Sequence, residues 1–67
     1  MSNTMTRAVR DDLAKLAYAM CRGLPRADRR ALIEGVFARR HDITPDMAYA
    51  LYVRGKDLVR REKGKAA

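Results

Sequence analysis

The chain has 67 residues, with 15 Lys and Arg against 8 Asp and Glu, which gives a net charge of +7 near neutral pH. A chain of this length forms one domain at most, and its thin core leaves no volume for a deep substrate cleft, which argues against an enzyme and a small-molecule substrate. One Cys and one His are too few for an internal disulfide or a four-ligand structural zinc site, and we expect no cofactor.

The beginning of the chain has no apolar run of signal-peptide length, and no stretch approaches the length of a membrane span. We therefore expect a cytoplasmic protein that does not enter a membrane. Leu, Ile, Val and Phe together account for only thirteen residues, so a lone monomer would be marginally stable. Self-association would bury more apolar surface, and the composition accordingly favours a homodimer.

Abundant Ala, Leu, Arg and Met with few β-branched residues predict an all-α fold. The pattern indicates a small three-helix domain over residues 1–62 and a flexible basic tail over residues 63–67. The first helix is predicted from about Thr6 to Arg22, with Gly23 as its left-handed stop and with Asp11 four residues from both Arg7 and Lys15. Its apolar stripe comprises Met5, Val9, Leu13, Leu16, Met20 and Leu24.

The second helix is predicted from about Pro25 to Arg40, because proline is tolerated in a first helical turn. Phe37, the single Phe, is expected at the centre of the core. Ala27 and Ala31 are expected to allow close approach of a neighbouring helix. The remaining buried candidates of this helix are Leu32, Ile33 and Val36.

The third helix is predicted to begin at Thr44-Pro45-Asp46, where Thr44 caps the helix, Pro45 takes the first helical position and Asp46 meets the helix dipole. Asp57 is placed to pair with Arg61, four residues further on. The expected inner stripe is Ala48, Leu51, Gly55 and Leu58, flanked by Met47, Tyr52 and Val59.

The segment from Glu34 to Val53 resembles the helix-turn-helix units of DNA-binding proteins. Phe37-Ala38 matches the buried apolar and small residues of the first helix of such a pair, His41 to Thr44 match the turn, and Ile43, Ala48 and Leu51 match inward positions. Asp42 stands where the family prefers Gly, and Asp tolerates a left-handed backbone. The resemblance implies that the second helix lies in the major groove and exposes Thr44, Pro45, Asp46, Tyr49, Ala50 and Arg54.

This presumed reading face carries Asp46 and is short of the Arg, Lys, Gln and Asn side chains that make paired contacts to bases. The net charge, in contrast, suits a polyanion, because phosphate contacts supply most non-specific affinity. The sequence therefore predicts a small regulator that binds double-stranded DNA mainly through the phosphate backbone. The predicted contact residues are Thr44, Tyr49, Arg54, Lys56, Arg60 and Arg61.

A second hypothesis is a non-enzymatic inhibitor or adaptor, of the kind found in phages and plasmids, that binds and blocks a larger protein. Tyr and Arg are enriched in interface hot spots, and the candidate residues are Arg26, Arg30, Tyr18, Tyr49 and Tyr52. A membrane-surface binder is disfavoured, because acidic residues interrupt every basic face. Cys21 and His41 do not make a catalytic pair, because nothing in the sequence supplies a third orienting group or an oxyanion hole.

Overall fold

The computed structural model describes residues 6–66, and within them it contains three helices and no strand. The first helix is α1 (Arg7–Met20) and the last is α4 (Pro45–Ala66). The middle helix is continuous but has three parts, which are α2 (Arg26–Ala31), the π-helical segment η1 (Leu32–Phe37) and α3 (Ala38–Arg40). The all-α, three-helix prediction is confirmed.

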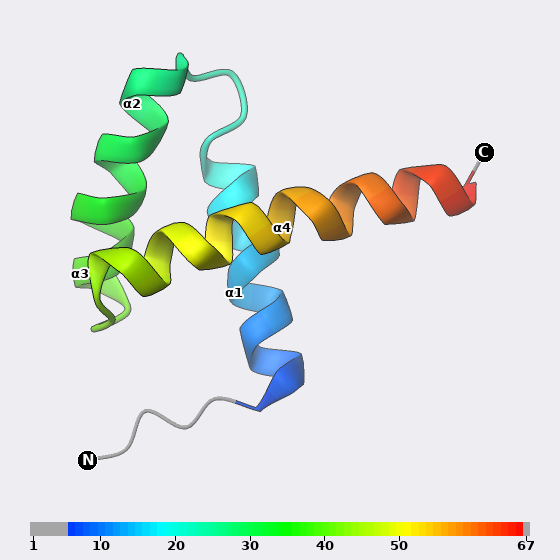
Figure 1. Cartoon of the computed structure of the whole chain (residues 1–67), viewed down its shortest axis with the longest axis horizontal. Coiled ribbons are helices and arrows are strands. Elements are labelled where there is room, and N and C mark those ends of the chain that lie inside the picture. Colours follow the sequence, from blue (N-terminus) through cyan, green and yellow to red (C-terminus); the bar gives the residue numbers. More distant parts are fainter. Residues whose placement is uncertain (1–5, 67) are drawn as a thin grey trace.

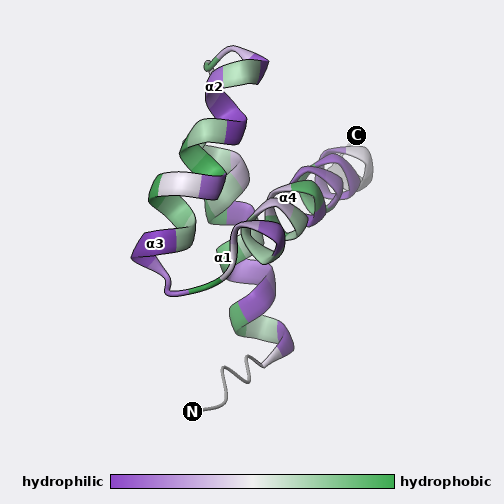
Figure 2. Ribbon diagram, turned by 60° about the vertical axis from the view of Figure 1, so that its left-hand side comes forward, coloured by the Kyte–Doolittle hydropathy of each residue, from purple (hydrophilic) through white to green (hydrophobic). Residues whose placement is uncertain are grey.

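The helices form a flat, open arrangement with extents of 41 × 29 × 14 Å (Figure 1). Helix α4 crosses α1 near the middle of its own length, and its N-terminal half packs against the middle helix. Its C-terminal half projects past α1 (Figure 1) and is largely hydrophilic (Figure 2). No helix in the part of the chain described is both long enough and apolar enough to cross a membrane.

The backbones of α1 and α4 touch where they cross. A Cβ atom placed on Gly55 would lie 1.9 Å from the carbonyl oxygen of Ala14 and 2.5 Å from its carbonyl carbon. Two ion pairs join the same helices, one between Asp11 and Arg54 and one between Lys15 and Glu62. The prediction that Asp11 pairs with Arg7 and Lys15 on its own helix is therefore wrong, because Asp11 and Lys15 each pair with a residue of α4.

The core is built from small residues together with a few larger ones. Phe37 and Ile33 are fully buried, which confirms Phe37 as the core centre. The predicted stripe of α1 is only partly correct, because Val9 and Leu16 remain 47% and 44% exposed. Met5 lies outside the described residues. The buried hydrophobic residues are Ala14, Ala17, Cys21, Ile33, Phe37, Ala38, Ala48, Leu51 and Tyr52.

The π-helical turn changes which residues of the middle helix face the core. The amide of Ala38 donates to the carbonyl oxygen of Ile33, five residues earlier. This wider turn places Ile33 and Ala38 on the same side of the helix, and both are buried. Val36 is turned outward and is 55% exposed, so its predicted burial is wrong. Ala27 and Ala31 are also exposed, and the expected close approach at these two residues is wrong as well.

The corner between α3 and α4 has the predicted turn chemistry. Asp42 adopts a left-handed backbone with φ of 54°, and the amide of Ile43 donates to the carbonyl oxygen of Ala38. The hydroxyl of Thr44 accepts a hydrogen bond from the amide of Met47 at 3.1 Å, and α4 begins at Pro45. At the other corner Gly23 has φ of 86°, as expected for the residue that stops the first helix.

Helix α4 differs from its prediction at two places. Met47, expected beside the inner stripe, is 47% exposed, although Ala48 next to it is fully buried; Met47 lies about 100° around the helix from Ala48 and so misses the packed face. The helix also continues to Ala66, whereas the sequence predicted a tail from residue 63. Its apolar pattern ends near Val59, but helical hydrogen bonding continues without a packed face. Ala67 lies outside the described residues.

Candidate functional site

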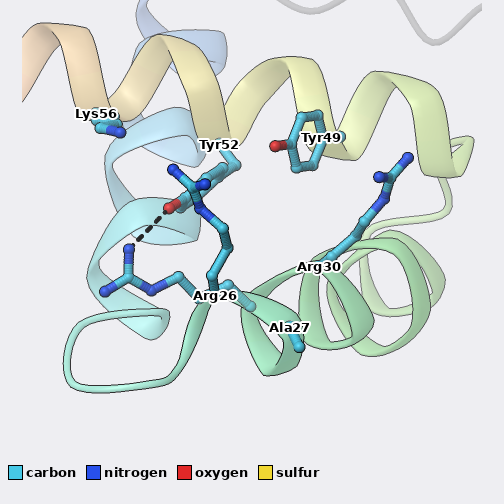
Figure 3. A pocket seen from close by; sticks show the side chains of 7 residues that line it. Arg26, Ala27, Arg30, Tyr49, Tyr52 and Lys56 are labelled. Atoms are coloured by element: carbon cyan, nitrogen blue, oxygen red, sulfur yellow. Dashed lines mark hydrogen bonds between the residues drawn. The ribbon is translucent and has the colours of Figure 1, made fainter.

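A groove of about 630 Å³ lies between the first turn of α2 and the middle of α4 (Figure 3). Four cationic side chains and two tyrosines line it, and no carboxylate does among the described residues. The arginines come from α2 and the tyrosines from α4. The lining residues are Arg26, Ala27, Arg29, Arg30, Tyr49, Tyr52 and Lys56.

Local sequence explains how both helices point these groups into one space. Pro25 has an extended backbone and precedes the first residue of α2, so Arg26 and Arg30 lie one turn apart on the same side. Tyr49, Tyr52 and Lys56 follow at spacings of three and four residues, which places them along one side of α4. The groove is therefore a product of helical periodicity on two facing helices.

Arg29 and Tyr52 form the fixed floor of the groove. The Arg29 guanidinium donates to the carbonyl oxygen of Leu24 at 2.8 Å and to the Tyr52 hydroxyl at 3.3 Å, the contact drawn in Figure 3. Tyr52 is buried, and the ring of Tyr18 lies 6.2 Å from its ring, centroid to centroid. These contacts hold one positive charge and one aromatic ring in place at the base of the groove.

Tyr49 and Arg30 form one wall. The guanidinium carbon of Arg30 lies 5.4 Å from the centroid of the Tyr49 ring, close enough for a cation–π contact. Arg30 also donates to Glu34 at 2.8 Å. Tyr49 lies 5.7 Å from Tyr52, ring to ring, yet remains 38% exposed. Arg30 lies over the ring and Tyr52 lies beside it, so the part of the ring that remains exposed is what a ligand could reach.

The basic residues of α4 separate onto two faces. With 3.6 residues per turn, Lys56, Arg60 and Lys63 fall within about 60° of one another, on the side of Tyr49. We call these three residues the basic stripe. Within residues 6–64, no carboxylate lies within 4.0 Å of a stripe nitrogen. The stripe thus extends the positive charge of the groove along the projecting half of α4.

Arg54 and Arg61 lie on the other face, about 140° away around the helix. Arg54 donates to Asp11 at 2.7 Å, and Arg61 pairs with Asp57 at 3.1 Å. The hydrogen bond from Arg54 holds the pKa of Asp11 below its usual value, so this carboxylate keeps its charge to a lower pH than a free aspartate does. Both arginines are therefore partly neutralised within the chain.

The structure brings together the residues predicted to contact a protein, but it divides the residues predicted to contact DNA. Arg26, Arg30, Tyr49 and Tyr52 meet in the groove, and Tyr18 supports it from behind. The predicted DNA-contact residues are divided, since Lys56 and Arg60 share a face with Tyr49. Arg54 and Arg61 lie on the other face, and the Thr44 hydroxyl is used as a helix cap.

Two residues of the site were not among the predicted contact residues, although the sequence places each of them in a cluster of basic residues. Arg29 lines the groove and fixes Tyr52, and Lys63 continues the basic stripe. A signal for Lys63 exists in the sequence, because it lies seven residues after Lys56 and therefore on the same side of the helix. Arg29 stands in a basic cluster with Arg26 and Arg30, but its contact with Tyr52 depends on the fold and has no signal in the sequence.

The exposed face of the first half of α4, where the helix-turn-helix resemblance places base contacts, is acidic and apolar. Asp46, Tyr49, Ala50 and Val53 are exposed there. None of them is a side chain type that reads bases by paired hydrogen bonds. This face therefore lacks both cations and side chains that make paired hydrogen bonds to bases, and the cations of the site lie in the groove and the basic stripe.

Cys21 and His41 occupy structural positions. Cys21 is buried in the core, and this burial raises the pKa of its thiol above the ordinary value, which lowers its reactivity. His41 packs against Phe37 with 4.5 Å between ring centroids. Its Nε2 atom is buried and has no hydrogen-bond partner among the described residues.

Similarity to known proteins does not identify the site. Comparisons of the chain with protein families, with curated proteins and with solved structures give no match.

Proposed function

We propose that this protein binds DNA through the phosphate backbone, using the basic groove and the basic stripe as one continuous surface. The observation that carries the proposal is the division of charge on α4. Lys56, Arg60 and Lys63 share a face with the groove and have no acidic partner among residues 6–64, whereas Arg54 and Arg61 are ion-paired. Such unpaired, aligned cations release counterions from a polyanion on binding.

The surface supports binding that depends weakly on base sequence. Phosphate contacts position a protein on DNA but carry no sequence information by themselves. The exposed residues at the start of α4, including Asp46 and Val53, are poor readers of base edges. In this proposal, the helix-turn-helix resemblance describes only how the corner between α3 and α4 is built. The surface that contacts DNA is the basic side of α4.

Neighbouring arginines of α4 provide a sharp test. Arg60→Gln should weaken binding to a duplex by roughly eightfold at about 0.1 M salt, because one phosphate contact is lost. Arg61→Gln should change the affinity little, because Arg61 faces the other way and pairs with Asp57. Fluorescence anisotropy of a labelled duplex, titrated with each variant, measures both effects. Equal losses in the two variants would contradict the assignment of the binding face.

A dimer remains part of the proposal. Val9, Leu13, Leu16 and Met20 repeat at spacings of four, three and four, the pattern of a helix that pairs with a copy of itself. Val9 and Leu16 lie exposed, whereas Leu13 and Met20 pack partly against the core of their own chain and offer only their outer surface to a partner. We propose that a second copy covers this stripe, which would place two basic surfaces on one duplex.

Substitution of an exposed residue tests the dimer without disturbing the core. Leu16→Glu should convert the dimer into a monomer, because a charge would be buried at the centre of the paired stripe. Sedimentation equilibrium measures the mass, and Arg22→Glu, at an exposed position beyond the stripe, is the control. A wild-type chain that sediments as a monomer at high concentration would refute the dimer.

The second candidate function is the inhibitor or adaptor that binds a larger protein. The gathering of Arg26, Arg30, Tyr49 and Tyr52 around one groove favours it, because Arg and Tyr are enriched at interface hot spots. Salt separates the two functions. Binding to DNA must weaken steeply as salt rises, whereas a protein interface centred on buried aromatic rings depends on salt much less.

A further inference from the structure

The groove differs from the basic stripe in shape and in chemistry. It is concave, with a volume of about 630 Å³, and it contains aromatic rings as well as charges. This volume falls in the range of pockets that hold ligands of nucleotide size. The phosphate backbone of a duplex meets a protein as a convex ridge, so a duplex places no base in such a space.

The ring of Tyr49 is the group in the groove that is available for stacking. It is 38% exposed, whereas Tyr52 beside it is buried and held by Arg29. Because Tyr52 is fixed, Tyr49 beside it is already restricted in its motion. It therefore loses less conformational entropy when a flat ligand packs on it. Arg26 and Lys56 reach the same space from opposite helices (Figure 3).

We propose that the groove binds an unpaired nucleotide of a single-stranded nucleic acid, with the base against Tyr49 and the phosphate between Arg26 and Lys56. Grooves that combine positive charge with aromatic rings hold single strands in this way, because every base has a flat face. The inference rests on the proposed function and specifies the form of nucleic acid that the groove takes.

The basic stripe gives the strand a path out of the groove. Lys56 belongs to both surfaces, and the helix rises by about 10 Å from Lys56 to Lys63. Arg60 lies between them on the same face. The phosphates that follow the bound nucleotide would therefore meet one cation at each successive turn of α4.

The test compares a single-stranded thymidine oligonucleotide with a duplex of equal length, using three forms of the protein. The wild type should bind the single strand about tenfold more tightly at equal salt. Tyr49→Leu should lose about this factor on the single strand and little on the duplex, because the flat ring is gone. Tyr49→Phe keeps the ring and should bind both nucleic acids like the wild type.

Charge within the groove is tested separately. Arg26→Gln should weaken single-strand binding, whereas Arg39→Gln, at an exposed position on α3 outside the groove, should not. Circular dichroism of each variant during heating shows whether it folds like the wild type. A variant that melts earlier is measured at a temperature where it is folded.

Three results would overturn the inference, and they separate its failure from failure of the proposed function. If Tyr49→Leu binds the single strand like Tyr49→Phe, the ring does not stack and the inference fails. If the wild type binds both nucleic acids equally, with losses only in stripe variants, backbone binding stands and the nucleotide site fails. If neither nucleic acid binds but polyglutamate does, both proposals fail and the groove takes acidic proteins.

Discussion

Replacing Gly55 by alanine should destabilise this domain far more than the same replacement at Gly35 or Gly64. The added Cβ would lie 1.9 Å from the carbonyl oxygen of Ala14 and 3.2 Å from the amide nitrogen of Lys15. Both neighbours are backbone atoms, so neither can move aside without shifting α1. We expect a loss of at least about 2 kcal/mol, even though alanine favours helix over glycine by up to about 1 kcal/mol.

Thermal unfolding followed by circular dichroism measures this loss, and two other glycines serve as matched controls. A Cβ on Gly35 or Gly64 would meet nothing within 4 Å, so Gly35→Ala and Gly64→Ala should leave the stability unchanged or raise it slightly. Because domains of this size have little stability to spare, the loss in Gly55→Ala should leave a substantial fraction of the chains unfolded. Equal melting of Gly55→Ala and wild type would contradict the close crossing of α1 and α4.

Removing all three charges of the basic stripe should produce the largest change in function. The triple variant Lys56→Gln, Arg60→Gln and Lys63→Gln loses three phosphate contacts. We therefore expect a shallower slope of log affinity against log salt, by about 2.7, and an affinity for duplex DNA roughly 500-fold lower at about 0.1 M salt. Anisotropy titrations over a salt series yield both quantities.

A control of equal charge change distinguishes position from net charge. The variant Arg39→Gln, Arg40→Gln and Arg61→Gln also loses three positive charges, at exposed positions outside the groove and the stripe. It should retain most of the affinity and of the salt slope. If both triple variants lose affinity equally, the protein attracts DNA by its net charge alone, and the stripe has no special role.

The helices and their ends were predictable because short-range chemistry determines them. Thr44, Pro45 and Asp42 act at the corner as their side chains and backbone preferences require. Phe37 is buried at the core centre because it is the largest apolar side chain of the middle helix. These features depend on a few neighbouring residues and need no knowledge of the fold.

The buried face of α1 was not predictable from hydrophobicity. The sequence pattern favours Val9 and Leu16, but the structure buries Ala14 and Ala17. The reason is the close crossing at Gly55, which leaves room only for small side chains between the helices. A prediction from hydrophobic periodicity is dominated by large side chains. In α1 it therefore indicates the face of Val9 and Leu16, which lies beside the buried face of Ala14 and Ala17.

The candidate site was predictable in its residue types and not in its grouping. Helical spacing places Lys56 and Arg60 on one side of α4, and it separates them from Arg54 and Arg61. The partner of Arg54 is Asp11, 43 residues earlier in the chain, and such a contact appears only once α1 and α4 are packed. Likewise the π-helical turn that exposes Val36 has no marker in the local sequence.

The most direct test of binding through the phosphate backbone is the affinity of the wild-type protein for a random-sequence duplex, measured by anisotropy from low to physiological salt. Contacts from Arg26 and the three stripe residues predict a slope of about −3.6 for log affinity against log salt. Binding through the phosphate backbone therefore predicts high affinity at low salt that falls steeply as salt is added. Absence of binding at low salt, or an affinity that does not change with salt, would contradict it.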